Sequence, residues 1–150
     1  MVEITIDRVE GDFGFEAKDA LGHTVKIDSS VENGGSNFGT RPTQLLLMGL
    51  GTCSGIDIVA ILNKQKQTID KFKMHIKGQR EKDKTPALWE TIHMVFELTG
   101  NIDEDKAKRA CALSIDKYCT VAETLRRAGA KITWEVRVAP SGPLSPVGGT

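Results

Sequence analysis

The chain has 150 residues, and its 20 basic and 20 acidic side chains give a formal net charge of zero. This length suits one domain with a core of its own, and the balanced charge leaves no basic field that would attract nucleic acid. The first residues, MVEITIDRVEGD, lack the charged-then-apolar order of a signal peptide, and we therefore expect a cytoplasmic protein.

Alternating apolar and polar residues predict three short strands in the N-terminal third. The apolar members are Val2, Ile4 and Ile6, then Phe13 and Phe15, then Val25 and Ile27. Turns at 10–12 and 20–22 separate them, a pattern that is typical of an antiparallel meander. The stretch 29–40, SSVENGGSNFGT, is rich in Gly, Ser and Asn and is predicted to be a loop.

A long apolar helix is predicted from about Pro42 to Lys66, because proline suits the first turn of a helix. Its segment Leu45–Leu62, LLLMGLGTCSGIDIVAIL, approaches the length of a membrane span, but Asp57 interrupts it. We interpret it as the core helix of a soluble protein that does not enter a membrane.

Gly49, Gly51 and Gly55 lie inside this helix, although glycine costs about 1 kcal/mol relative to alanine there. The helix is apolar around most of its circumference, so one face of one sheet cannot cover it. Small residues let a second backbone approach closely, which favours a symmetric dimer that pairs two copies of the helix. The alternative is that the same surface is covered within one chain.

The second half of the chain begins with a predicted hairpin of two long strands. Alternation resumes at 71–77 and again at 91–98, with the charged turn EKDKTP between them. A last alternating strand follows at 132–138, and residues 140–150, PSGPLSPVGGT, form a Pro/Gly-rich tail.

Two further helices are predicted between these strands. Asp103 begins the first of them, and the other begins near Cys119, where Thr120 and Glu123 have the spacing of a capping box. Gly129 ends the latter helix. The order βββ–α–ββ–αα–β indicates an α+β fold with an antiparallel sheet, in one domain over residues 1–139.

Three cysteines, Cys53, Cys111 and Cys119, are too few and too irregularly spaced for a disulfide scaffold or a metal site. Small neighbours leave room for a substrate beside Cys53, and Cys119 lies at the start of a predicted helix, a position that lowers the pKa of a thiol. Cys111, between two alanines within a helix, is predicted to be a core residue. Two such thiols suggest redox chemistry, in which one is oxidised to a sulfenic acid and the other condenses with it. The alternative for each is a small buried apolar side chain.

Two segments resemble the OsmC/Ohr family of thiol-dependent peroxidases. The string GTRPTQLLLMGLGTCSGIDIV is similar to the central helix of that family with its peroxidatic cysteine, and KYCTVAETLRR is similar to the segment that carries the second cysteine. The two cysteines lie 66 positions apart, and the resemblance extends over nearly the whole chain.

The resemblance implies an intertwined homodimer, in which antiparallel sheets from both chains wrap around two long central helices. By analogy, Cys53 would attack the O–O bond of a hydroperoxide, Cys119 would resolve the resulting sulfenic acid, and an external dithiol would reduce the disulfide. The family's chemistry needs neither a metal nor an organic cofactor. Apolar residues near the site, Leu46, Leu50 and Ile56, favour organic hydroperoxides as substrates.

This chain departs from the family at one position of the site. Well-studied members place a glutamate ten residues before the reactive cysteine, paired with an arginine that contacts the thiolate. Thr43 occupies that position here, and the next residue, Gln44, could orient a cation by hydrogen bonding. The candidate cation is Arg41, and the alternative is Arg8 on the first strand of the partner chain.

Two alternative functions stay open. A dimer with the same fold could have lost peroxidase chemistry and hold an apolar ligand or a partner beside Cys53, which the missing glutamate favours. An enzyme that scavenges electrophiles with Cys53 alone would leave Cys119 unexplained. The presence of both cysteines favours the peroxidase.

Overall fold

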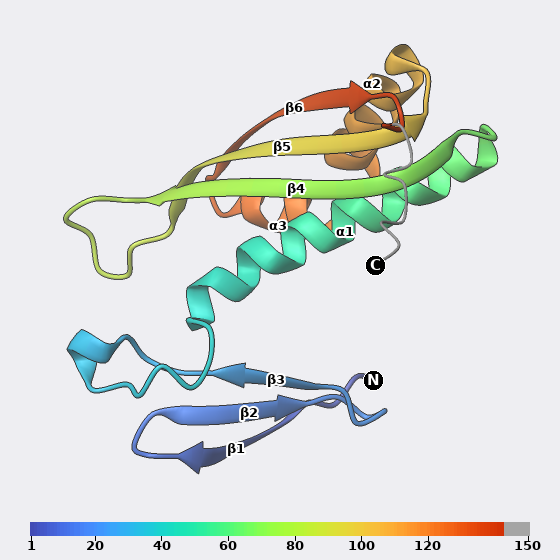
Figure 1. Ribbon diagram of the computed structural model, residues 1–150. Coiled ribbons are helices and arrows are strands. Elements are labelled where there is room, and N and C mark those ends of the chain that lie inside the picture. Colours follow the sequence, from blue (N-terminus) through green and yellow to red (C-terminus); the bar gives the residue numbers. More distant parts are fainter. Residues whose placement is uncertain (143–150) are drawn as a thin grey trace, which may run out of the picture. The chain divides into compact units, whose positions relative to one another are not determined.

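The computed structural model describes residues 1–142 (Figure 1), and the secondary structure follows the predicted order of strands and helices. The elements are β1 (Thr5–Glu10), β2 (Gly14–Lys18), β3 (Thr24–Ile27), the 3₁₀ turn η1 (Val31–Asn33), α1 (Pro42–Lys64), β4 (Thr68–Arg80), β5 (Trp89–Asn101), α2 (Glu104–Leu113), the π-helical turn η2 (Ser114–Tyr118), α3 (Thr120–Arg127) and β6 (Lys131–Ala139). The chain divides into two compact units, residues 1–48 and 49–150, with the boundary inside α1. From position 143 onward, the predicted tail lies outside the described residues.

The first unit contains the predicted antiparallel meander, in the order β1-β2-β3. The register gives this sheet one face that contains Ile6, Ala17, Val25, Arg8, Phe15 and Ile27. Residues that are paired across strands share a face, so this face is apolar apart from Arg8. It is largely open to solvent, because the side chain of Ile6 is 59% exposed.

The loop 28–40 is organised around Asp28, which is buried. Its carboxylate accepts hydrogen bonds from the N–H groups of Ser29 at 2.7 Å, Ser36 at 2.9 Å and Phe38 at 3.0 Å. The N–H of Phe38 contributes most to lowering the pKa of Asp28; burial opposes this effect, and the other two N–H groups add to it. A single carboxylate therefore fixes the backbone that leads into α1.

The second unit is built on a sheet in the order β4-β5-β6. β4 and β5 form the predicted antiparallel hairpin, but β6 runs parallel to β5. The expectation of a wholly antiparallel sheet is therefore wrong for this sheet, which is mixed. The crossover through α2, η2 and α3 returns the chain to the end of the sheet where β5 begins, as a parallel pair requires.

The three helices lie on one face of this sheet (Figure 1). The central strand β5 supplies much of the core beneath them through the alternating residues Ile92, Met94, Phe96 and Leu98, all of which are buried. Val95, on the other face of the strand, is buried as well. The core of the second unit therefore forms between this face of the sheet and the helices.

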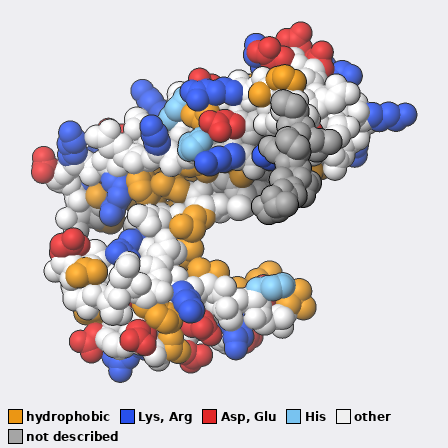
Figure 2. Space-filling view, in the orientation of Figure 1, with side chains coloured by type: hydrophobic (Ala, Val, Ile, Leu, Met, Phe, Trp, Pro, Cys, Tyr) orange, Lys and Arg blue, Asp and Glu red, His pale blue; other side chains and the backbone are white. Residues whose placement is uncertain are grey.

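The opposite face of the sheet is charged, and Figure 2 shows basic, acidic and histidine side chains gathered over it. Polar contacts join the strands there: His75 with Glu97 at 3.4 Å, Arg137 with Glu97 at 3.7 Å, and His93 with Glu135 at 3.6 Å. Within β6, Arg137 pairs with Glu135 at 3.0 Å. β4 adds the exposed lysines Lys71, Lys73 and Lys77.

Two of the three helix glycines are explained within the chain. A Cβ on Gly51 would lie 2.3 Å from Ile76 Cδ1, and a Cβ on Gly55 would lie 3.0 Å from Met74 Cε, so both glycines let α1 approach β4 closely. Gly49 differs, because its Cβ would meet only Val121, at 4.0 Å. The structure thus supports the intrachain alternative for Gly51 and Gly55.

By length and composition α1 could cross a membrane. In the folded unit, however, Leu50, Ile58 and Leu62 of this helix are completely buried. α1 is a core helix, as its sequence predicts.

Candidate active site

Two of the three thiols come together in the second unit. Cys53 lies on α1 and is half-buried, whereas Cys119 lies at the start of α3 and is 2% exposed. Both are free thiols, and the hydroxyl of Ser54, the residue after Cys53, donates to Cys119 Sγ at 3.4 Å. Cys53 is close enough to raise the pKa of Cys119. Residues 66 positions apart in sequence therefore share one site.

Cys111 is a core residue, as its alanine neighbours predicted. Its side chain is completely buried in α2, and burial raises the pKa of the thiol to about 12. Because the thiolate is the reactive form of cysteine, this thiol is inert near neutral pH.

Cys119 caps α3 with its sulfur. Sγ accepts a hydrogen bond from the N–H of Ala122 at 3.4 Å. The prediction of a capping box is wrong, because Thr120 is already the first helical residue and Glu123 binds Arg127 at 3.0 Å instead. The charge-assisted bond to arginine competes successfully with a return bond to the backbone.

A π-helical turn places Cys119 next to α1. The N–H of Cys119 donates to the carbonyl of Ser114 at 2.7 Å, which closes the turn. The buried Ser114 hydroxyl donates to Asp57 Oδ2 at 3.0 Å and lies 3.3 Å from the carbonyl oxygen of Ser54. Asp57 and Ser54 follow Cys53 on α1, so these bonds fix the start of α3 against the segment that carries Cys53.

The surroundings of the Cys119 thiol shift its pKa in opposite directions. Burial is the largest and raises its pKa. Hydrogen bonds from the Ser54 hydroxyl, at 3.4 Å, and from the N–H of Ala122 lower the pKa, while the neighbouring Cys53 raises it again. The net result is a pKa above the usual value, so in the reduced protein Cys119 keeps its proton.

The predicted partners of the reactive thiol, Arg41, Gln44 and Arg8, belong to the first unit. Arg41 Nη1 donates to the carbonyl of Gly39 at 2.9 Å, and Gln44 Oε1 accepts from the hydroxyl of Thr40 at 3.0 Å. Both contacts stay within the loop and the first turn of α1. The action of these residues on the thiol remains a prediction.

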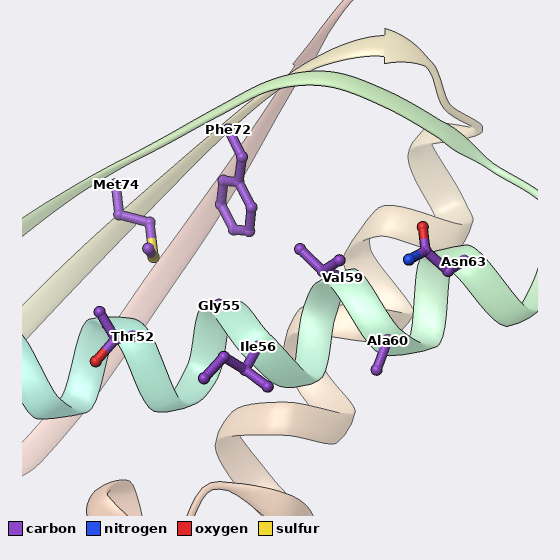
Figure 3. Close-up of a pocket in the computed structure, with 8 residues that line it drawn as sticks. All are labelled: Thr52, Gly55, Ile56, Val59, Ala60, Asn63, Phe72 and Met74. Carbon is purple, nitrogen blue, oxygen red and sulfur yellow. The ribbon is translucent and has the colours of Figure 1, made fainter. Parts of the chain in front are cut away.

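An apolar groove of about 590 Å³ follows the exposed side of α1. Figure 3 shows Phe72 and Met74 reaching from β4 toward the helix, which contributes the remaining lining residues: Thr52, Gly55, Ile56, Val59, Ala60 and Asn63. Thr52 immediately precedes Cys53. Of the apolar residues expected near the site, Ile56 lines the groove and Leu50 is core.

Comparison with known families settles the relationship of the chain. The family model described as OsmC-like protein matches residues 33–135, which include both Cys53 and Cys119. The chain belongs to the OsmC-like family.

The chain is also similar to individual proteins. "Protein YhfA" of Escherichia coli (strain K12) is 36% identical over 121 residues, which cover 80% of this chain and 86% of YhfA. The crystal structure of a hypothetical protein from Aquifex aeolicus VF5 has a TM-score of 0.74 at 29% identity. The match covers 92% of this chain and 97% of the Aquifex chain.

An organic hydroperoxide resistance protein, OhrB of Bacillus subtilis, has the same fold. Its TM-score is 0.63 at 18% identity, with 91% of this chain and 98% of OhrB covered. At that identity the likeness concerns the fold.

Sequence reasoning missed two side chains of this OsmC-like site. Neither Ser54 nor Ser114 was singled out as a site residue from the sequence. Their hydroxyls meet Cys119 and Asp57 only because α1 and η2 pack together. The available signal was the CSGID string, in which Ser54 and Asp57 are three positions apart and so lie on neighbouring parts of one helix face.

Proposed function

We propose that this protein is a thiol-dependent peroxidase that reduces organic hydroperoxides, with Cys53 as the peroxidatic thiol and Cys119 as the resolving thiol. The observation that carries the proposal is the placement of a second free thiol, Cys119 at the N-cap of α3, within 3.4 Å of the hydroxyl of Ser54, the residue that follows the half-buried Cys53 on α1. Two free thiols so placed are candidates for a disulfide.

The chemistry proceeds in two steps on these sulfurs. The Cys53 thiolate attacks the terminal oxygen of the hydroperoxide, the O–O bond breaks, and the alkoxide leaves and takes a proton to become an alcohol. Cys53 is then a sulfenic acid, oxidised by two electrons. The Cys119 sulfur attacks the Cys53 sulfur, hydroxide leaves and takes up a proton to become water, and a disulfide results. An external dithiol returns both thiols by exchange.

The groove beside α1 supports an organic substrate. Its lining from Ile56, Val59, Phe72 and Met74 is apolar, and burial of alkyl groups there gains about 25 cal/mol per Å². OhrB, whose name refers to organic hydroperoxide resistance, shares the fold. The substrate class follows from this chemistry.

We assign to Arg41 the role of stabilising the Cys53 thiolate, with Gln44 orienting the cation. A guanidinium near a thiolate favours the charged form and so increases the reactive fraction. Gln44 lacks the charge of the family's glutamate and supplies a hydrogen bond alone. The chemistry requires no metal or organic cofactor, since all electrons pass through sulfur.

A homodimer completes the proposal. Gly49, Thr52, Ile56 and Ala60 form a largely exposed stripe along α1, and Ile56 is 70% exposed. Thr52, Ile56 and Ala60 also line the groove, so in the dimer a second copy would form the far side of the groove. Among residues 1–142, no contact requires Gly49 to lack a side chain, whereas close approach of a second α1 would. Apolar patches of this kind on a folded chain are typical of association surfaces.

The decisive experiment is peptide mass spectrometry of the reduced protein after brief exposure to one equivalent of cumene hydroperoxide. We expect a loss of about 2 Da, the two hydrogens lost in disulfide formation, mapped to Cys53 and Cys119. Cys53→Ser should abolish peroxide consumption, and Cys119→Ser should stop the reaction at a sulfenic acid or an overoxidised Cys53. Turnover that survives Cys53→Ser would disprove the assignment.

A second candidate is a binding protein for an apolar ligand, which the groove and the uncharged Thr43 favour. An unmodified Cys53 after treatment with stoichiometric peroxide, together with a bound apolar molecule in native mass spectra, would establish this alternative.

A further inference from the structure

We propose that Ser54 is a positioning residue for the resolving step: its hydroxyl holds the Cys119 sulfur beside Cys53 and stabilises that sulfur as a nucleophile once Cys53 has been oxidised. This inference rests on the proposed peroxidase function. It adds a residue and a sequence of events that neither the cysteine spacing nor the family resemblance supplies.

The first support is the commitment of the Ser54 hydroxyl. Ser54 is completely buried, and its Oγ donates to Cys119 Sγ at 3.4 Å. Within residues 1–142 this hydroxyl has no second hydrogen-bond partner. A helical serine commonly bonds to a carbonyl of the preceding turn, so its use on sulfur couples α1 specifically to Cys119.

The second support is a clamp, the hydrogen bond between Ser114 and Asp57, which fixes α3 relative to α1. Ser114, the first residue of the π-helical turn, is bound to Asp57, and Cys119 ends that turn. A shift of α3 along α1 would break the Ser114–Asp57 bond and the Ser54–Cys119 bond together. π-helical turns frequently occur at functional sites, and here the turn sets the position of a thiol.

The third support is the balance of interactions around Cys119 before and after oxidation. In the reduced protein, the neighbouring Cys53 raises the pKa of Cys119. Conversion of Cys53 to a neutral sulfenic acid would remove the charge that its attacking thiolate carries. Two donors then remain on the Cys119 sulfur, the Ser54 hydroxyl and the N–H of Ala122. Cys119 thus becomes reactive after the first step rather than before it.

Other charged groups surround this sulfur and stay constant through the reaction. Lys117 lies in η2, Glu123 and Arg127 lie on α3, and all three line a pocket of about 360 Å³ that also contacts Cys119. Glu123 is already bound to Arg127. Asp57 on α1 is bound to Ser114.

The test separates the two half-reactions. Reduced protein is mixed with one equivalent of cumene hydroperoxide over a range of pH and quenched with an alkylating reagent, while a cyclic 1,3-diketone traps sulfenic acid. Mass spectrometry then measures the Cys53 sulfenic acid and the Cys53–Cys119 disulfide against time. Ser54→Ala is compared with Thr124→Ala, which removes another hydroxyl from this region, one that donates to the carbonyl of Thr120.

For Ser54→Ala we expect oxidation of Cys53 at the wild-type rate and slower disulfide formation at neutral pH. Each unit of increase in the pKa of Cys119 lowers its thiolate fraction about tenfold, and higher nucleophilicity recovers part of that, so the net loss is about threefold per unit. At strongly alkaline pH the rates should converge. Ser114→Ala, which disturbs the clamp, should slow disulfide formation at every pH.

Three outcomes would overturn the inference. If Ser54→Ala forms the disulfide at the wild-type rate, the Ser54 hydroxyl has no role in the resolving step. An equal slowing at every pH would show a purely structural role. An absence of any oxidised Cys53 in the wild-type protein would overturn the peroxidase proposal as well, and that result is read separately from the first two.

Discussion

At the scale of single residues, burial distinguishes two cysteines whose local sequences are similar. Small residues flank Cys53 and Cys111 alike, yet the first is half-buried and the second is completely buried. A thiol with a pKa of about 12 does not compete for the sulfenic acid of its neighbour. Cys111 therefore does not compete with Cys119 for the proposed disulfide with Cys53.

Asp28 gives a prediction for the pH dependence of stability. Its pKa in the folded chain lies below the usual value of 3.8. A carboxyl group with a depressed folded pKa stabilises the fold fully above its unfolded pKa, and this stability is lost as pH falls through the folded pKa. We expect Asp28→Asn to lower the melting temperature at pH 7, and the difference from wild type to shrink below about pH 4.

Thermal melts by circular dichroism at both pH values measure this difference. Asp7→Asn, at an exposed position on β1, serves as the control and should leave the melting temperature unchanged. An Asp28→Asn variant that matches wild type at neutral pH would contradict the role given to the three N–H bonds.

At the scale of elements, the contact between α1 and β4 depends on a missing side chain. Gly51→Ala should destabilise the protein by up to about 2 kcal/mol, because overpacking costs about 1–3 kcal/mol and the gain in helix propensity returns about 1. The new Cβ would collide with Ile76 Cδ1. Urea denaturation measures the free energy of unfolding.

Ile76→Val removes the atom that would collide and provides the matched control. Alone it should cost about 0.5–1.5 kcal/mol. Combined with Gly51→Ala, the total loss should be smaller than the sum of the two single losses, as expected for residues in contact. Additive losses would mean that the collision is not the cause.

Element types were largely predictable from the sequence, whereas their pairing was not. Alternation identified β4 and β5 and placed Ile92 and Phe96 in the core, because a strand has a period of two whichever neighbour it pairs with. The period of two is the same for parallel and antiparallel strands, so the parallel pairing of β6 with β5 could not be predicted from the sequence. The thiol cap of α3 was missed because Thr120 and Glu123 match a common capping pattern and a cysteine does not.

The site was predictable to a similar degree. Cys53 and Cys119 were found from their neighbours and from family resemblance, because those signals lie within short segments. The Ser54 and Ser114 contacts depend on the packing of α1 against η2, which no local pattern encodes. Phe72 and Met74 were expected on one face of β4, but their place in the groove follows only from that packing.

At the scale of the whole molecule, the exposed stripe on α1 predicts how copies associate. Ile56→Glu should convert a dimer into a folded monomer, because its side chain is 70% exposed within one chain and a buried carboxylate at an interface is costly. Light scattering should report half the wild-type mass, with an unchanged circular dichroism spectrum.

Gln79→Glu adds the same charge on β4, outside the stripe, and should leave the mass unchanged. A wild-type protein that is monomeric at micromolar concentration would contradict the dimer. An Ile56→Glu protein that keeps the wild-type mass would place the interface elsewhere.

The lysines on β4 have a consequence for solubility. β4 is an edge strand of its sheet, and exposed edges are templates for pairing with another copy of the same strand. Lys71, Lys73 and Lys77 would bring rows of ammonium groups close together in such a pair, with no carboxylate from β4 among these three outward positions to offset them. Repulsion along this edge therefore opposes the pairing of two copies through β4, while the uncharged stripe on α1 carries no such repulsion.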